Sequence, residues 1–361
     1  MKNDRGDGSP TDTLEKRKNI DGTAPTYRAM FLTVLIGCVG GGTLGLTGIP
    51  AGPIIGSSIA VGICALIGLK VRCNSLLQCV GFSLVGIGIG VSISTETFDL
   101  SSWLVSIILS NASTFSIFCV GIFLLNRLFS FDKTTAALCS FPGALGQTVE
   151  VSISEGADVA AVITCQCFRL TVTVLFISIF ASTTGIVLSQ TASAESISWQ
   201  LSGLILIVSL VAGYLASRMA VPAAYILAGL IVGCVFRDAG VVSGTLPDVL
   251  MFIGFVLVGC AVGVGFANLG LQELKANSLA ALALFVTASL ISAVYAAVAA
   301  FLTSVSFFQA WVAFSPGAAE TMAAIALSTN IDPSYVAAHH VIRILCLSVL
   351  IVVLFRRPRK V

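Results

Sequence analysis

Two arginines lie deep inside apolar stretches, where a charged side chain is costly. Arg169 and Arg343 each follow an aspartate by eleven residues, Asp158 and Asp332 respectively, and aspartate is a favoured helix N-cap. Eleven residues of helix place each arginine about 16 Å along its axis, near the middle of a hydrocarbon core about 30 Å thick. A guanidinium at that depth marks, by default, a functional pathway with a partner nearby.

A polar residue precedes each arginine by three positions, on the same helix face: Gln166 in one case and His340 in the other. Shortly before each helix a Pro-Gly-Ala sequence, beginning at Pro142 or Pro316, interrupts a helical pattern. We expect the two breaks and the two arginine faces to meet at mid-membrane and bind a carboxylate or similar anion. Glu320 and His340 could exchange a proton there. The expected binding residues are Pro142, Gly143, Gln147, Glu150, Gln166, Arg169, Pro316, Gly317, Glu320, His340 and Arg343.

An alternative interpretation is that the arginines pair with Glu150, Glu320 or helix-end carbonyls and only stabilise the fold. A metal site is not expected, because His339 and His340 are the only histidines and adjacent helical residues point about 100° apart. Glycine-rich runs such as Gly86–Gly90 lack the strand and acidic residue of a nucleotide site and predict close helix packing instead. We expect no cofactor, no metal and no nucleic-acid partner.

The composition identifies the elements that must position these residues. Hydrophobic residues make up 57% of the 361 residues and charged residues 10%, against about 25% charged in a soluble domain. The apolar residues form runs of about 17–25, long enough to cross a bilayer as helices. The fold class is therefore all-α integral membrane protein.

The chain also repeats itself. Residues 80–91 match residues 253–264 at seven of twelve positions, and residues 142–169 align without a gap on residues 316–343. Matched proline, aspartate and arginine in the same order cannot come from composition alone. We expect a polar tail over residues 1–28, a first membrane repeat over 29–190 and a second over 191–361.

About ten transmembrane helices are expected, five in each half, with re-entrant segments over about 134–156 and 308–330. Re-entry keeps most basic residues and both termini on the cytoplasmic side and places Trp103, Trp199 and Trp311 at the outer boundary. Five crossings per half then make the two halves an inverted repeat, which is common in secondary transporters.

These motifs resemble the AbrB duplication family of bacterial inner-membrane proteins, often labelled putative ammonia monooxygenases or AbrB family transporters. The similarity rests on Pro142 to Leu145, Gln166-x-x-Arg169, Pro316 to Met322, and Asp332-Pro333 through His339-His340-x-x-Arg343. It implies a membrane protein that acts as a transporter or as a regulator of gene expression, without a defined substrate. The monooxygenase label is rejected, because two adjacent histidines cannot supply a copper or iron site.

The sequence thus predicts a secondary transporter for a small organic anion, driven by a proton or sodium gradient, in the bacterial inner membrane. Its partners would be the anion and membrane lipid; a homodimer stays open. The alternative is a membrane-embedded sensor that alters gene expression through a partner protein. No nucleophile–base pair is evident, so we do not expect an enzyme.

Overall fold

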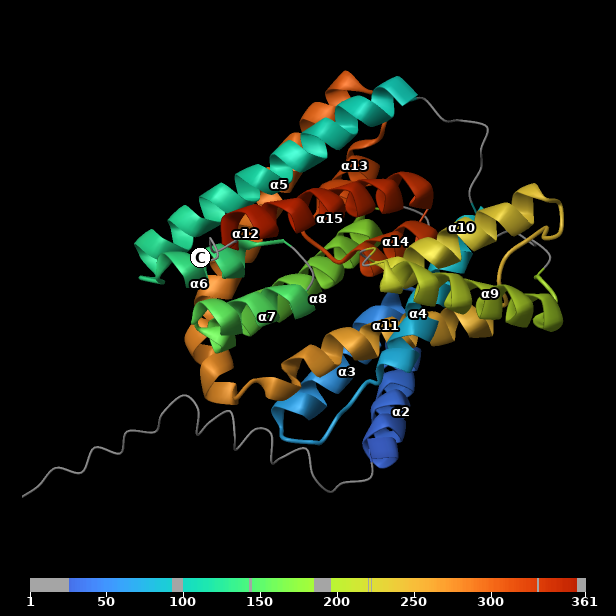
Figure 1. Ribbon diagram of the computed structural model, residues 1–361, viewed down its shortest axis with the longest axis horizontal. Coiled ribbons are helices and arrows are strands. Elements are labelled where there is room, and N and C mark those ends of the chain that lie inside the picture. The colour runs from blue at the N-terminus through green and yellow to red at the C-terminus, as the bar shows by residue number, and fades with distance from the viewer. Residues whose placement is uncertain are drawn as a thin grey trace, which may run out of the picture.

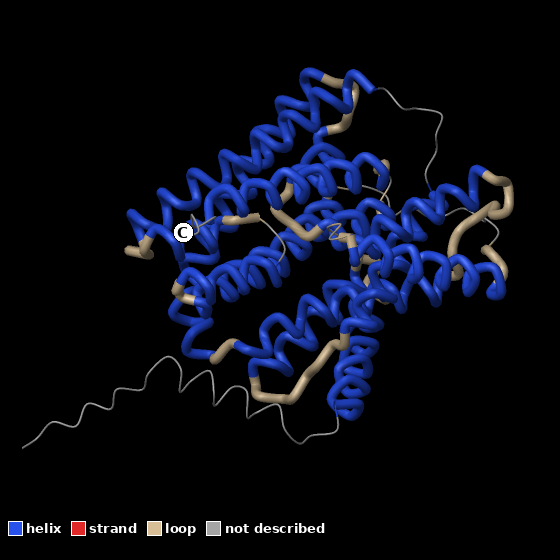
Figure 2. The backbone as a smooth tube through the Cα atoms, in the orientation of Figure 1, coloured by secondary structure: helices blue, strands red, loops and turns tan. Residues whose placement is uncertain are grey.

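The computed structural model of the protein describes residues 26–92, 100–142, 145–184, 196–219, 221, 223–329 and 331–355. Apart from one isolated bridge between Ser196 and Thr245, the secondary structure in these parts is helical (Figures 1 and 2). The helices are α2 (Thr26–Gly45), α3 (Gly52–Leu66), α4 (Ser75–Ser92), α5 (Leu100–Leu128), α6 (Lys133–Ser140), α7 (Leu145–Glu155), α8 (Val159–Thr183), α9 (Trp199–Arg218), α10 (Ala224–Asp238), α11 (Asp248–Val264), the 3-10 helix η2 (Gly265–Asn268), α12 (Leu271–Leu302), α13 (Phe307–Phe314), α14 (Ala319–Ser328) and α15 (Pro333–Phe355).

Eight of these helices are long and apolar enough to cross a membrane within the described residues. The chain is therefore an all-α membrane protein, as its composition predicts. The other two expected crossings, α3 and α10, are present at the predicted positions but contain only 15 residues each. The interrupted segments are pairs of short helices, α6 with α7 and α13 with α14.

The helices of the two predicted halves pack reciprocally. Helix α10 packs extensively against α4, and α11 packs against α3, so that each half's second helix contacts the other half's third (Figure 1). Helices α4 and α11 also contact each other, as do α5 and α12. The domain boundaries and the inverted orientation of the halves stay predictions.

Glycines allow the closest of these contacts. A Cβ atom on Gly86 or Gly90 of α4 would collide with the carbonyl oxygens of Ile226 or Leu230 in α10. A Cβ on Gly259 of α11 would meet the backbone of α3 in the same way. Since small residues let membrane helices approach each other, these glycine runs serve packing, as their spacing predicts.

The two interrupted segments differ in their surroundings. Helices α13 and α14 are almost entirely buried and belong to the largest hydrophobic cluster, and α14 contacts α4, α8, α11 and α15. Helix α7 contacts mainly α6 and α8 and exposes Ile153. The second segment is therefore enclosed by protein, whereas in the first segment α6 is mostly buried and α7 is partly exposed.

Polar caps fix where the short helices begin. The Asp132 carboxylate accepts hydrogen bonds from the backbone N–H groups of Thr134 and Thr135 at the start of α6. Partial burial would raise the pKa of Asp132, but these bonds and the Thr135 hydroxyl outweigh it and lower the pKa below its ordinary value. Asp158 caps α8 in the same manner, as the sequence predicts.

Trp311 is a correction to the predicted aromatic belt. Its indole is 6% exposed and packs edge-to-face against Phe176 and Phe180 of α8. A side chain enclosed by protein cannot lie among lipid headgroups, so Trp311 is a core residue. Trp199 is 59% exposed and remains compatible with a boundary position.

Candidate functional site

The first arginine is held at the end of α6. Because α6 stops before Pro142, its last carbonyl groups have no helical partners. The Gln166 Nε2 group donates to the carbonyls of Leu138 (2.9 Å) and Phe141 (2.7 Å). The Gln166 Oε1 atom accepts from Arg169 Nη2 at 2.8 Å, and Arg169 Nη1 donates to the Phe141 carbonyl at 3.5 Å. Gln166 thus joins the broken segment to the arginine.

The second arginine is held in an equivalent way at the end of α13. Arg343 Nη1 donates to the Ser315 carbonyl (2.6 Å), and Nη2 donates to the Gly317 carbonyl (2.8 Å) and to His340 Nδ1 (2.6 Å). His340 Nε2 lies 3.3 Å from the Val312 carbonyl. A guanidinium only donates, so Nδ1 accepts and the Nε2–H group donates to Val312. This arrangement defines a neutral His340.

These contacts match at one offset. Leu138 and Val312 are 174 residues apart, as are Phe141 and Ser315, Gln166 and His340, and the two arginines. A further pair follows the same offset: the backbone N–H of Asp158 donates to the Thr135 hydroxyl, and that of Asp332 donates to the Gln309 amide. The sequence alignment and the hydrogen bonds therefore describe the same correspondence.

Neither arginine has an anionic partner in the described part of the chain. Both side chains are 3% exposed, and their described partners are carbonyl oxygens, an amide oxygen and an imidazole nitrogen, all neutral. The Nε groups of both arginines are buried without a hydrogen-bond partner among these residues. The site thus concentrates positive charge and retains unused donors.

The structure brings together part of the predicted site. Pro142, Pro316 and Gly317 are buried at the two breaks, beside the arginines they were expected to accompany. Gly143 and the side chains of Gln147 and Glu320 lie outside the described residues. Glu150 is exposed on α7, so it is not buried with the arginines as the prediction had it.

A second polar cluster escaped the sequence analysis. His339 Nε2 lies 2.7 Å from the Ser106 hydroxyl of α5, and His339 Nδ1 lies 2.7 Å from the Tyr335 carbonyl. The rings of Trp103, Phe314 and Tyr335 surround the imidazole. The position of His339 next to His340 was visible in the sequence, but no pattern there indicates that α5 supplies its partner.

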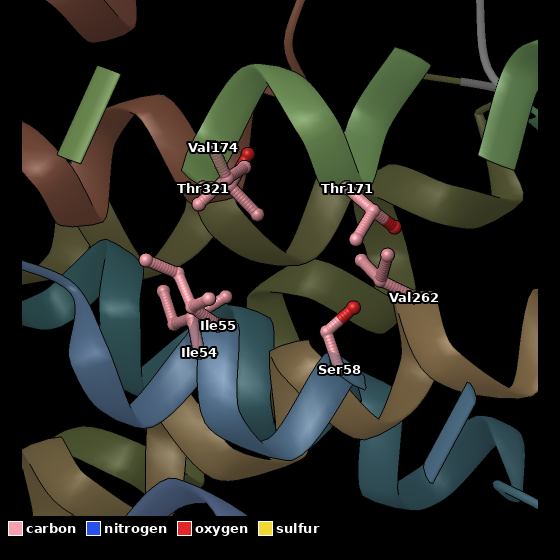
Figure 3. A pocket seen from close by; sticks show the side chains of 7 residues that line it. All are labelled: Ile54, Ile55, Ser58, Thr171, Val174, Val262 and Thr321. Carbon is pink, nitrogen blue, oxygen red and sulfur yellow. The ribbon is translucent and has the colours of Figure 1, made fainter. Parts of the chain in front are cut away.

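A small hollow lies between α3, α8, α11 and α14 (Figure 3). Its volume is about 10 Å³, which is room for about one water molecule. The lining is aliphatic with three hydroxyl groups, and comprises Ile54, Ile55, Ser58, Thr171, Val174, Val262 and Thr321. No organic acid fits this hollow, and neither arginine lines it.

The amino-acid sequence is similar to one family model and to a protein of Escherichia coli. The family model described as "Transition state regulatory protein AbrB" matches residues 53–358. The protein named "Putative regulator AbrB" of Escherichia coli (strain K12) is 26% identical over 230 residues, which cover 61% of this chain and 65% of that protein. The match therefore spans a little less than two thirds of that relative. Because the family model covers most of the sequence, including both arginine clusters, the chain belongs to the AbrB family of membrane proteins.

Proposed function

We propose that the protein is a secondary transporter of small organic anions in the bacterial inner membrane, with both termini in the cytoplasm. The observation that carries the proposal is the pair of buried arginines whose described partners are all neutral. Removing a charge from water costs several kcal/mol per ion even after relaxation. A bound carboxylate would offset that cost at both arginines.

The geometry around Arg343 supports an anion in particular. Its guanidinium lies beside the break before α14, whose N-terminus begins at Ala319. The first N–H groups of a helix have no helical acceptors and carry partial positive charge. The Arg343 Nε group is also free among the described residues. Each of these features favours an acceptor with negative charge.

Transport rather than passive binding is supported by the layout of the segments. Interrupted helices at membrane depth are characteristic of the substrate sites of secondary transporters. The proposal assigns no chemical reaction to the chain.

Thermal unfolding of the detergent-purified protein with acetate, lactate, succinate and citrate tests the binding step. An acid at about 100 times its Kd should stabilise the folded state by roughly 2.7 kcal/mol. We expect one class of acid to stabilise the wild type. The same acid should not stabilise Arg169→Gln or Arg343→Gln. The matched control is Arg218→Gln, because Arg218 is exposed and contacts Tyr214 only at the surface. Stabilisation that persists in both site variants, or is absent in the wild type with all four acids, would refute the proposed site.

A second candidate is a membrane-embedded sensor, which the name of the Escherichia coli relative favours. Both functions predict ligand binding, so uptake must separate them. The acid that stabilises the purified protein is radiolabelled and offered to proteoliposomes under an imposed pH or sodium gradient. If proteoliposomes that contain the wild-type protein take up more of the acid than those that contain Arg343→Gln, the result supports the transporter. Binding without uptake under either gradient favours the sensor.

A further inference from the structure

The Ser106 hydroxyl has one proton and two acceptors within hydrogen-bond distance, and the Tyr335 hydroxyl lies next to it. Its Oγ atom lies 2.7 Å from His339 Nε2 and 3.0 Å from the Trp103 carbonyl. A hydroxyl can donate to only one of them at a time. The direction of the Ser106 bond therefore depends on whether His339 Nε2 carries a proton.

The other ring nitrogen of His339 has a fixed role. His339 Nδ1 faces the Tyr335 carbonyl at 2.7 Å, and a carbonyl only accepts, so Nδ1 carries a hydrogen. Two complete hydrogen-bond arrangements follow. In the neutral form, Ser106 donates to Nε2. In the charged form, Nε2–H donates to Ser106, which then donates to the Trp103 carbonyl, and no heavy atom has to move.

His340 offers no such alternative. Its Nδ1 atom accepts from Arg343 and its Nε2–H group donates to the Val312 carbonyl. A proton added at Nδ1 would place two donors face to face and break the bond to Arg343. Of the two histidines, only His339 can therefore gain a proton while its partners stay in place.

The charges around His339 couple this proton to an anion. Arg343 lies one turn further along α15, and its positive charge acts on the imidazole. Helix α5 contributes Trp103 and Ser106, and α13 contributes Phe314, none of which is charged. The other ionisable groups at this end of α15 are Asp332, Tyr335 and His340; the Glu320 side chain of α14 lies outside the described residues. Arg343 is thus the described charge that opposes a proton on His339.

We propose that His339, hydrogen-bonded between Ser106 and the Tyr335 carbonyl, is a proton-binding site that loads together with a carboxylate on Arg343. Burial of His339 and the charge of Arg343 both disfavour an imidazolium, and an anion that neutralises Arg343 removes the second of these contributions. By reciprocity, the proton then strengthens binding of the anion. The inference rests on the proposed function and specifies it as proton–anion symport, with His339 rather than His340 as the proton carrier.

Calorimetry in two buffers of different ionisation enthalpy measures protons taken up per anion bound. Acetate, lactate, succinate and citrate are titrated at pH 7 into the purified protein. We expect anion binding to be accompanied by net proton uptake in the wild type. Arg218→Gln is the control, because Arg218 is exposed and contacts Tyr214 away from both clusters, and it should keep the uptake. His339→Gln should bind the same acid with proton uptake near zero. Anion binding without proton uptake in the wild type overturns the inference and leaves the proposed function intact.

The 15N NMR spectrum of histidine-labelled protein tests the inference without any ligand. The sequence contains two histidines, so the spectrum holds two side chains, each assigned by its His→Gln variant. We expect His340 to keep a bare Nδ1 as the pH falls, while His339 gains a proton at Nε2. Ser106→Ala should alter the His339 signals alone. If His340 gains a proton at a higher pH than His339, then His339 is not the proton-binding histidine and the inference is overturned. This result does not depend on whether any of the four acids binds, so it is separate from the test of the proposed function.

Discussion

Gln166 offers the sharpest test of how the broken segment is held in place. Its amide serves three groups at once: the carbonyls of Leu138 and Phe141 and the Nη2 atom of Arg169. Gln166→Ala removes all three bonds from a side chain that is 0% exposed. The Phe141 carbonyl would keep only the 3.5 Å contact with Arg169. Water cannot replace the lost partners unless the site opens.

The cost follows from these three groups. A buried polar group left without a partner costs about 1–3 kcal/mol, and more when it is charged. The Leu138 carbonyl and Arg169 Nη2 lose their described partner, while the Phe141 carbonyl keeps one weak contact, so Gln166→Ala should be roughly 2–6 kcal/mol less stable than the wild type. Gln166→His should cost only about 1 kcal/mol, because His340 performs the equivalent task in the second cluster with one donor and one acceptor.

Native cysteines make this change measurable. Cys139 and Cys165 are 0% exposed beside Leu138 and Gln166, and no cysteine in the described residues forms a disulfide. After the accessible thiols, which include the exposed Cys119 and Cys346, are blocked in the folded protein, a thiol-reactive fluorescent dye added during heating reports when the buried thiols become accessible. We expect Gln166→Ala to open at a clearly lower temperature than the wild type and Gln166→His to stay close to it.

Two results would refute this reasoning. If Gln166→Ala opened at the wild-type temperature, the three hydrogen bonds would not hold α6 in place. If Gln166→His were as unstable as Gln166→Ala, the chemical equivalence of the two clusters would be wrong. The reciprocal variant, His340→Gln, checks the second cluster in the same assay.

Three further predictions concern packing and capping. Gly86→Ala should destabilise the protein by about 1–3 kcal/mol, because the new Cβ forces α4 away from α10. Gly42→Ala has open space around the new Cβ and should stabilise the protein by about 0.5–1 kcal/mol. The denaturation midpoints of the two variants should therefore shift in opposite directions. Trp311→Ala should cost about 3–5 kcal/mol, against less than about 1 kcal/mol for the exposed Trp199→Ala, in thermal unfolding. Asp132→Ala should cost about 1 kcal/mol. The pKa of Asp132 is lower in the folded protein than in the unfolded chain. Its contribution to stability is therefore complete above the unfolded pKa and is lost as the pH falls through the folded pKa. The difference in unfolding free energy between the wild type and Asp132→Asn should accordingly shrink below about pH 4.

The helices were predictable because the membrane imposes their length and apolar character. The break at Pro142 and the N-cap Asp158 were equally readable, since proline and aspartate act on the backbone within a few residues. The environment of Trp311 was not readable. A tryptophan between polar and apolar sequence is compatible both with a lipid boundary and with a protein core, and only the position of α8 decides between them.

The candidate site was predictable only where its contacts are local. Three-residue spacing within one helix predicted that Gln166 contacts Arg169 and that His340 contacts Arg343, and both contacts are present. The contact between Ser106 and His339 joins residues 233 positions apart, and nothing in either segment specifies that separation. The different burial of α7 and α14 likewise depends on which helices surround each one.

The lengths of the helices have a consequence for the surrounding lipid. Helices α3 and α10, with 15 residues each, measure about 22 Å, whereas α5 and α12, with 29 and 32 residues, measure about 44 and 48 Å. A hydrocarbon layer about 30 Å thick is too thick for the first pair and too thin for the second unless that pair tilts or projects into water. Where tilt does not remove this difference, the protein presents different hydrophobic heights to the bilayer, and the lipids beside it stretch or compress to match. The acyl-chain length of the surrounding lipids would therefore influence the tilt of α5 and α12, and with it any conformational change in which these two helices take part.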